Sequence, residues 1–160
     1  MIPSGDVARR YRRHQLDEQE ANAPPRLATW VARTTDIRST LAVSSEPLGN
    51  VEPMSRAELN WLITIRSDGG LPFDGVAPAL IEWGTETHPA KRLREASCSF
   101  VKLEAFHLEA QRIPTLFRSI GVDGSVSVAP LRPGERPYLM AHLQTPAGLR
   151  RLSGAAGPAR

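Results

Sequence analysis

The segment from Leu71 to Leu93, which reads LPFDGVAPALIEWGTETHPAKRL, is the stretch around which the expected fold is built. It opens with Pro, Asp and Gly residues, which favour turns because they supply special backbone angles. An apolar run from Val76 to Ile81 follows, and in a strand the next two residues, Glu82 and Trp83, point to opposite faces. Pro78 has no backbone N–H to donate, so we expect it at a sheet edge or among the first residues of the strand.

The residues before this segment predict a strand, a helix and two further strands. These elements cover Arg26–Arg33, Asp36–Ser45, Val51–Arg56 and Asn60–Arg66. Asp36 or a neighbouring threonine can cap the helix, because their side-chain oxygens accept from the free N–H groups of the first turn. Pro53 favours an edge position for the second strand. The third strand, NWLITIR, is aromatic and β-branched and gives the strongest strand signal in the chain.

The residues after the segment repeat this order of elements. We expect strands at Ser99–Phe106, Ser125–Ala129, Tyr138–Leu143 and Leu149–Leu152, and a helix near Ile113–Ile120. The helix has apolar residues at i, i+3, i+4 and i+7, and Gly121 gives a C-terminal stop. The sequence therefore predicts an α+β fold of two β-α-β-β-β units, residues 26–84 and 99–152. One such unit leaves a sheet face exposed, so we expect the two units to share a core.

Length and composition limit the class of protein. A chain of 160 residues is expected to form one domain, and it contains no apolar run near the roughly 20 residues needed to span a membrane. Residues 1–25 read as a polar leader without the apolar core of a secretory signal, and residues 153–160 as a flexible tail. The single cysteine, Cys98, excludes an internal disulfide and fits a reducing compartment, so we expect a cytoplasmic protein.

The charge distribution argues against nucleic-acid binding. The sequence pI is about 9.6, but the last 15 residues contain three arginines and no acidic residue, a charge of +3. This equals the formal net charge of the whole chain, so residues 1–145 balance to zero. Nucleic-acid binders usually present a clustered basic face with aromatic stacking partners, whereas the basic clusters here are Arg9–Arg13 and the last residues, both at the ends of the chain.

Several stretches resemble the glyoxalase-like domain family of the vicinal-oxygen-chelate (glyoxalase/bleomycin resistance/dioxygenase) superfamily. The likeness runs from Arg26 to Leu152, and its most specific parts are RLATWVART and the stretch that contains PF, IEWG and HPA. It implies curved mixed sheets around a cleft, in which superfamily enzymes hold a divalent metal with His and Glu side chains. Family members usually begin with an earlier unit that carries a His-bearing first strand. The resemblance therefore implies that this chain is shortened at its N-terminus, with one wall of the cleft missing.

Candidate metal ligands follow from the resemblance and from residue type. We name Glu82, His88 and His107, with Glu104 and His142 as further candidates, since imidazole and carboxylate groups bind divalent ions. Glu82 ends the last strand of its unit, where the superfamily often places a ligand, and it is also the candidate catalytic residue. No ligand motif of known spacing is present, however, and roles at a strand edge, in a turn or as a cap explain these residues equally well. We therefore expect no tightly bound cofactor, with Zn, Mn, Ni or Fe as the alternative.

Candidate ligand-binding residues are the tryptophans Trp30, Trp61 and Trp83, together with Arg33. Pockets for small molecules are mostly apolar and aromatic, but tryptophans also pack in cores. Arginines at strand ends, Arg33 and Arg66 among them, either face an anionic ligand or are simply solvated.

Three functions remain open at this point. The first is a glyoxalase-like protein of unassigned reaction that binds a small molecule in the cleft between its units. The second is a metal-dependent lyase, isomerase or dioxygenase, in which the metal stabilises an oxyanion as a Lewis acid. The third is a truncated, non-catalytic fragment that oligomerises. Exposed sheet edges and an uncovered apolar face predict a homodimer, since unpaired edges recruit other chains.

Overall fold

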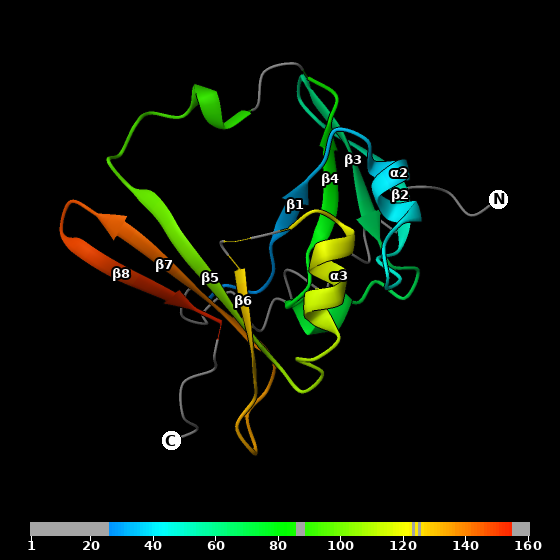
Figure 1. Cartoon of the computed structure of the whole chain (residues 1–160). Coiled ribbons are helices and arrows are strands. Elements are labelled where there is room, and N and C mark those ends of the chain that lie inside the picture. Colours follow the sequence, from blue (N-terminus) through cyan, green and yellow to red (C-terminus); the bar gives the residue numbers. More distant parts are fainter. Residues whose placement is uncertain (1–25, 86–88, 123, 125, 155–160) are drawn as a thin grey trace.

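The computed structural model of the chain describes residues 26–85, 89–122, 124 and 126–154, which form two four-stranded sheets with the α-helix Ile113–Ser119 between them (Figure 1). The first unit contains β1 (Val31–Arg33), α2 (Ile37–Ala42), β2 (Asn50–Arg56), β3 (Leu59–Ile65), the 3-10 helix η2 (Pro72–Gly75) and β4 (Ala79–Trp83). The 3-10 helix η3 (Pro89–Arg92) leads to the second unit, with β5 (Ser99–His107), α3 (Ile113–Ser119), β6 (Val126–Pro130), β7 (Tyr138–Thr145) and β8 (Gly148–Ser153). The predicted α+β class and the two β-α-β-β-β units are confirmed. The predicted polar leader, residues 1–25, lies outside the described residues.

The first sheet has the strand order β1-β4-β3-β2, with β1 parallel to β4 and the other pairs antiparallel. β2, which contains Pro53, is an edge strand as predicted. Pro78 directly precedes Ala79, the first residue of the central strand β4, so the second of its two expected positions is the observed one. The predicted first strand is shorter than expected, since only Val31–Arg33 of Arg26–Arg33 pairs in the sheet. Asp36 caps α2, and its side chain accepts a hydrogen bond from the N–H of Ser39.

The second sheet has a different strand order, β6-β5-β7-β8. Its first strand, β5, is parallel to β6 and antiparallel to β7, and β8 pairs only with β7 at the edge. In the first sheet the first strand instead pairs with the fourth. The two units therefore share their order of elements along the chain but not the order of their strands in space.

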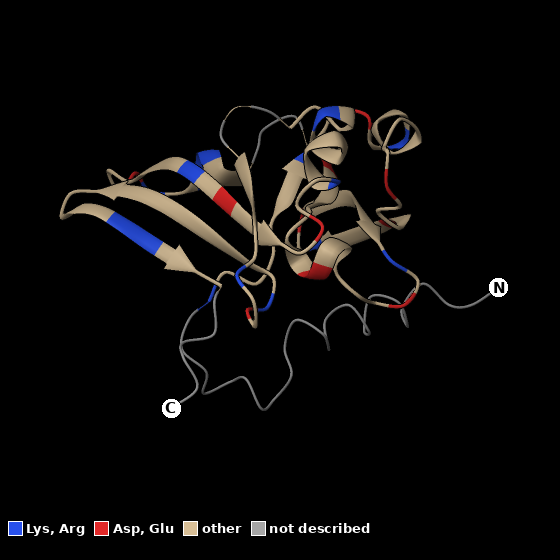
Figure 2. Cartoon of the chain, turned by 60° about the horizontal axis from the view of Figure 1, so that its bottom comes forward, with Lys and Arg blue, Asp and Glu red and all other residues tan. Residues whose placement is uncertain are grey.

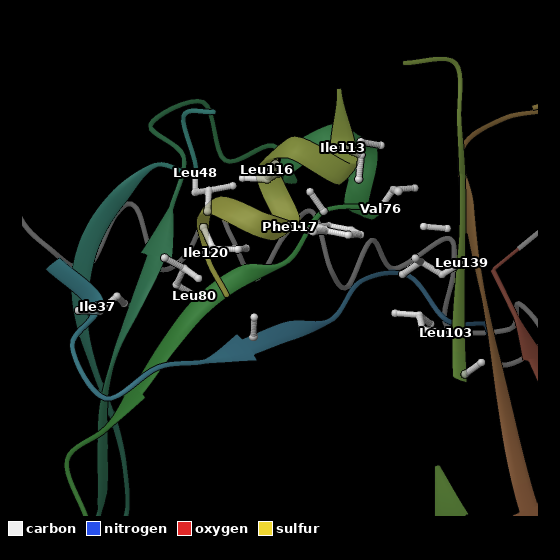
Figure 3. Close-up of a cluster of buried hydrophobic side chains, with 14 residues drawn as sticks. Ile37, Leu48, Val76, Leu80, Leu103, Ile113, Leu116, Phe117, Ile120 and Leu139 are labelled. Atoms are coloured by element: carbon white, nitrogen blue, oxygen red, sulfur yellow. The ribbon is translucent and has the colours of Figure 1, made fainter. Parts of the chain in front are cut away.

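One hydrophobic core joins the two units (Figure 3). Helix α3 contributes Ile113, Leu116 and Phe117, which are between 0% and 4% exposed. They pack with Ile37, Leu48, Val76 and Leu80 of the first unit and with Leu103 and Leu139 of the second. The expected sharing of a core is confirmed, and α3 is the element that provides it.

A smaller cluster lies on the other face of the first sheet. It contains Ile63, Ile65 and Ala79, with Met54 and Trp61 packed against it. None of the described helices is long and apolar enough to cross a membrane.

Candidate functional site

Glu82 points from β4 toward helix α2. Its Oε2 accepts a hydrogen bond at 2.7 Å from the backbone N–H of Ile37. Ile37 is the first residue of that helix. The predicted alternation holds, because Leu80, on the same face as Glu82, is buried in the shared core, whereas Trp83 packs against Trp61 on the other face with the rings tilted by 50°. A carboxylate beside the first turn of a helix satisfies a free N–H and faces the positive end of the helix dipole. The structure thus gives Glu82 a capping contact.

The three tryptophans do not form one group. Trp61 and Trp83 are paired across β3 and β4, with ring centroids 5.4 Å apart. Trp30 instead packs against the shared core, where its indole N–H donates to the carbonyl oxygen of Val76 at 2.8 Å and its ring meets Phe117 edge to face. Trp61 lines a pocket of about 260 Å³ together with Met54 and Glu82. Arg33 is exposed at the end of β1.

Among the described candidate metal ligands, Glu104 and His142 lie in contact, whereas Glu82 and His107 lie elsewhere. His88 lies outside the described residues. Glu104 accepts a hydrogen bond from Lys102 at 2.9 Å, and its Oε2 lies 2.5 Å from Nε2 of His142. Both contacts lower the pKa of Glu104, and the contact with Lys102 has the larger effect. Glu104 is three positions from His107 along β5, so the two side chains occupy opposite faces of that strand. No cluster of three or more potential ligands occurs within the described part of the chain. The described donors therefore do not fit a divalent-metal site.

A different feature brings the two units together: a pocket of about 390 Å³, here called the inter-unit pocket. Residues 46, 47, 66, 68 and 70–74 of the first unit and residues 107, 109 and 112 of the second form its walls. Its charged and titratable lining residues are Glu46, Arg66, Asp68, Asp74, His107, Glu109 and Arg112. A volume in this range is typical of small-molecule sites.

The backbone of η2 shapes one wall of the inter-unit pocket. Phe73 and Asp74 both have positive φ angles, 47° and 54°, and Gly75 follows with φ 90°. A positive φ costs non-glycine residues about 1–3 kcal/mol each and persists only where the surroundings enforce it. Gly75 is required, since a Cβ there would lie 2.4 Å from the carbonyl oxygen of Ala28. This turn brings the side chains of Phe73 and Asp74 against His107.

His107 ends β5 and is only 5% exposed. Its Nδ1 accepts a hydrogen bond from the N–H of Glu109 at 3.0 Å, so in the neutral ring the proton lies on Nε2. Nε2 is 3.6 Å from Oδ2 of Asp74, and the Phe73 ring meets the imidazole edge to face. In this tautomer neither nitrogen offers a lone pair to a metal ion, and the ring acts as a hydrogen-bond donor toward the pocket.

Both arginines of the inter-unit pocket are held by carboxylates. Arg66 binds Asp68 through two nitrogens, at 3.1 and 2.7 Å, and this pairing, helped by the N–H of Gly70, lowers the pKa of Asp68 to about 2. Arg112 binds Glu46 in the same two-pronged manner and also contacts Glu109. Its guanidinium lies 5.5 Å from the centre of the Phe73 ring. Two-pronged pairs of this kind are among the stronger charge-assisted contacts in proteins.

The sequence analysis expected a cleft between the units and named His107 and Arg66 singly, but it did not identify the set of residues that lines the inter-unit pocket. Asp74 and His107 are 33 positions apart, and no short motif links them. The one local signal for this pocket was the turn-forming sequence PFDG, residues 72–75, which the sequence analysis interpreted only as a turn before the next strand.

The comparisons with known proteins add a family. The sequence profile of the glyoxalase-like domain family matches residues 3–120, about three quarters of the chain. The matched range starts before Arg26 and stops at the end of α3, whereas the resemblance noted above ran from Arg26 to Leu152. No curated protein and no solved structure shows a significant match. Because the family profile covers well over half of its length, the chain belongs to the glyoxalase-like domain family.

Proposed function

We propose that this chain binds a small molecule in the inter-unit pocket. The observation that carries the proposal is His107, a polar side chain that is 95% buried yet makes no hydrogen bond through Nε2 to any described residue. No fully enclosed side-chain nitrogen or oxygen in the described part lacks a partner, so Nε2 is open to the pocket. Solvent in the pocket can accept from Nε2, and a ligand with an acceptor atom would take the place of that solvent.

The strained backbone of η2 supports the same proposal. Strain of this kind collects at ligand sites, where the surrounding structure holds it. Family membership agrees with a binding role, but a shared fold does not specify a reaction, and the reaction stays unassigned.

The alternative, a metal-dependent lyase, isomerase or dioxygenase, finds less support. The carboxylate of Glu82 accepts a hydrogen bond from the first residue of α2. In His107, Nδ1 accepts from the N–H of Glu109, and the proton of the neutral ring lies on Nε2.

Protein-observed NMR with the full ¹⁵N-labelled chain tests the binding proposal. A fragment set with anionic, neutral and cationic members should move the amide signals of Asp74, Gly75 and Glu109 in the wild-type protein. The variant His107→Gln should bind these fragments more weakly. His142→Gln is the matched control, because His142 is equally buried, at 5%, and does not line the inter-unit pocket. Equal losses in both variants, or no movement of the pocket signals with any fragment, would overturn the proposal.

An oligomeric role is a second candidate, and one feature of the second sheet favours it. Away from α3, Phe100 and Leu152 are 53% and 37% exposed, on the sheet face that is buried elsewhere by the core. In Figure 1 this end of β5, β7 and β8 reaches away from the helices. We propose that a second copy of the chain covers it. Edge-to-edge pairing of β8 is disfavoured, since Arg150 and Arg151 form a basic band on that strand (Figure 2) and would meet their own copies.

The compartment is also a proposal. Cys98 is exposed and unpaired as a thiol, which is stable in a reducing environment and supports a cytoplasmic location.

A further inference from the structure

We infer that the inter-unit pocket takes a small organic cation, an ammonium compound that also carries a neighbouring oxygen acceptor. This inference rests on the proposed function and names the chemical class of its ligand. The carboxylate of Asp74 would hold the ammonium group, and Nε2–H of His107 would donate to the oxygen.

The side chains that line the inter-unit pocket carry more negative than positive charge. Four carboxylates line it, those of Glu46, Asp68, Asp74 and Glu109, against the two guanidinium groups of Arg66 and Arg112. With His107 neutral, these side chains sum to a charge of −2. Opposite charge attracts a ligand to such a site and like charge disfavours it.

The arginines do not offset this preference. Asp68 occupies two nitrogens of Arg66, and Arg112 is shared by Glu46 and Glu109. An anionic ligand would have to displace a carboxylate from a two-pronged pair. Of the two alternatives left open for Arg66, an anionic ligand or solvation, the pairing with Asp68 disfavours the anionic ligand.

Asp74 is the carboxylate left for a cation. Among the described residues, the imidazole of His107 is the one basic group found near its carboxylate, and the Asp74 side chain is 75% exposed. The turn at η2 holds it at the pocket in a left-handed conformation, φ 54°. Unlike the other three carboxylates, it has no guanidinium partner in the described part of the chain.

His107 supplies an independent pointer to a ligand. It is more than nine-tenths buried, it lines the pocket, and the hydrogen bond to its Nδ1 leaves the proton on Nε2. The donor Nε2 and the acceptor Oδ2 of Asp74 lie 3.6 Å apart, too far to satisfy each other fully. A ligand with a donor and an acceptor on adjacent carbons can bond to both. A 2-amino alcohol has this arrangement, with its ammonium on Asp74 and its hydroxyl oxygen on His107.

Three probes of similar size separate the chemical classes: ethanolamine, propylamine and glycolate. Each is titrated into the full ¹⁵N-labelled chain at low ionic strength, and the pocket amides of Asp74 and Glu109 are followed. Ethanolamine should bind best, propylamine about tenfold more weakly because it lacks the oxygen, and glycolate should not move these signals. Added salt should weaken ethanolamine binding.

Asp74→Asn is the decisive variant, because asparagine tolerates a positive φ and the turn should be kept. It should lose about tenfold in ethanolamine affinity. Glu58→Gln removes the same charge from the turn between β2 and β3, where Glu58 pairs with Arg92, and should bind as the wild type does. A thermal melt of each variant checks that it is folded.

The outcomes separate this inference from the proposed function. If glycolate or neutral fragments move the pocket signals and ethanolamine does not, or if Asp74→Asn binds ethanolamine unchanged, the inference is wrong and binding in the pocket stands. If no molecule moves these signals, both are wrong.

Discussion

The carboxylate of Glu82 and the backbone N–H of Ile37 are joined by a hydrogen bond of 2.7 Å, which ties the last strand of the first unit to its helix. The two residues are 45 positions apart. A residue whose type and position suggested a catalytic or metal-binding role thus makes a contact that a helix cap would make. Replacing it is a direct test of that role.

Glu82→Ala should destabilise the fold by about 1 kcal/mol, the usual cost of losing a capping side chain. Glu82→Gln keeps an oxygen that can accept from Ile37 and should cost less. Urea unfolding followed by circular dichroism measures both values. Equal stability of all three proteins would show that the contact does not stabilise the helix.

Leu116→Ala should destabilise the chain by about 2–5 kcal/mol, because Leu116 is fully buried at the centre of α3 and its removal leaves a cavity between the sheets. Val43→Ala is the control, since Val43 is 64% exposed just after α2, and it should change stability by less than about 0.5 kcal/mol. Comparable losses would mean that the core does not depend on α3.

The ion pair of Arg66 and Asp68 predicts a measurable titration. The pKa of Asp68 is lowered from 3.8 to about 2, so the ionised form is favoured in the folded state. Any stability that it adds is present above the unfolded pKa and is lost as the pH falls through about 2. Carbon-13 NMR of the Asp68 carboxyl should show a midpoint near 2, and Arg66→Gln should move it upward.

Arg56→Gln serves as the control for this titration, because Arg56 lies at the end of β2 and is not among the described partners of Asp68. It should leave the midpoint of Asp68 in place. A midpoint near 3.8 in the wild-type protein would contradict the pairing.

Multi-angle light scattering at micromolar concentration should give twice the chain mass of 17.5 kDa if a second copy covers the apolar end of the second sheet. Phe100→Ser should shift the population toward monomer, because a half-exposed aromatic ring at an interface would lose its buried area. Val43→Ser also replaces an exposed apolar residue by serine, but on the surface of the first unit, and should leave the population unchanged. A wild-type monomer that binds no apolar dye would rule the dimer out.

Local patterns in the sequence predicted the elements well and their arrangement only in part. Alternation, capping by Asp36 and the position of Pro53 act over a few residues, and each was confirmed. The strand order of the second sheet depends on which distant strands meet, and local alternation carries no information on that.

The candidate site shows the same division. Residue type drew attention to His107, but its approach to Asp74 depends on a left-handed turn and on the packing of two units. Trp30 alternates in the sequence much as Trp61 does, yet its indole N–H bonds to Val76 within the shared core. Sequence spacing alone could not separate these two environments.

Helix α3 belongs to the second unit along the chain, yet its side chains complete the core of the first. Neither half can then lose its structure without exposing the apolar surface of the other, and the chain should melt in a single cooperative transition. Amide protons in β4 and β5 should exchange with solvent at the same slow rate, that of global unfolding. A gene fragment that stops before Ile113 would encode a first sheet with an open apolar face. The smallest part of this fold that a gene can pass on as an independently folding unit is therefore larger than either β-α-β-β-β unit.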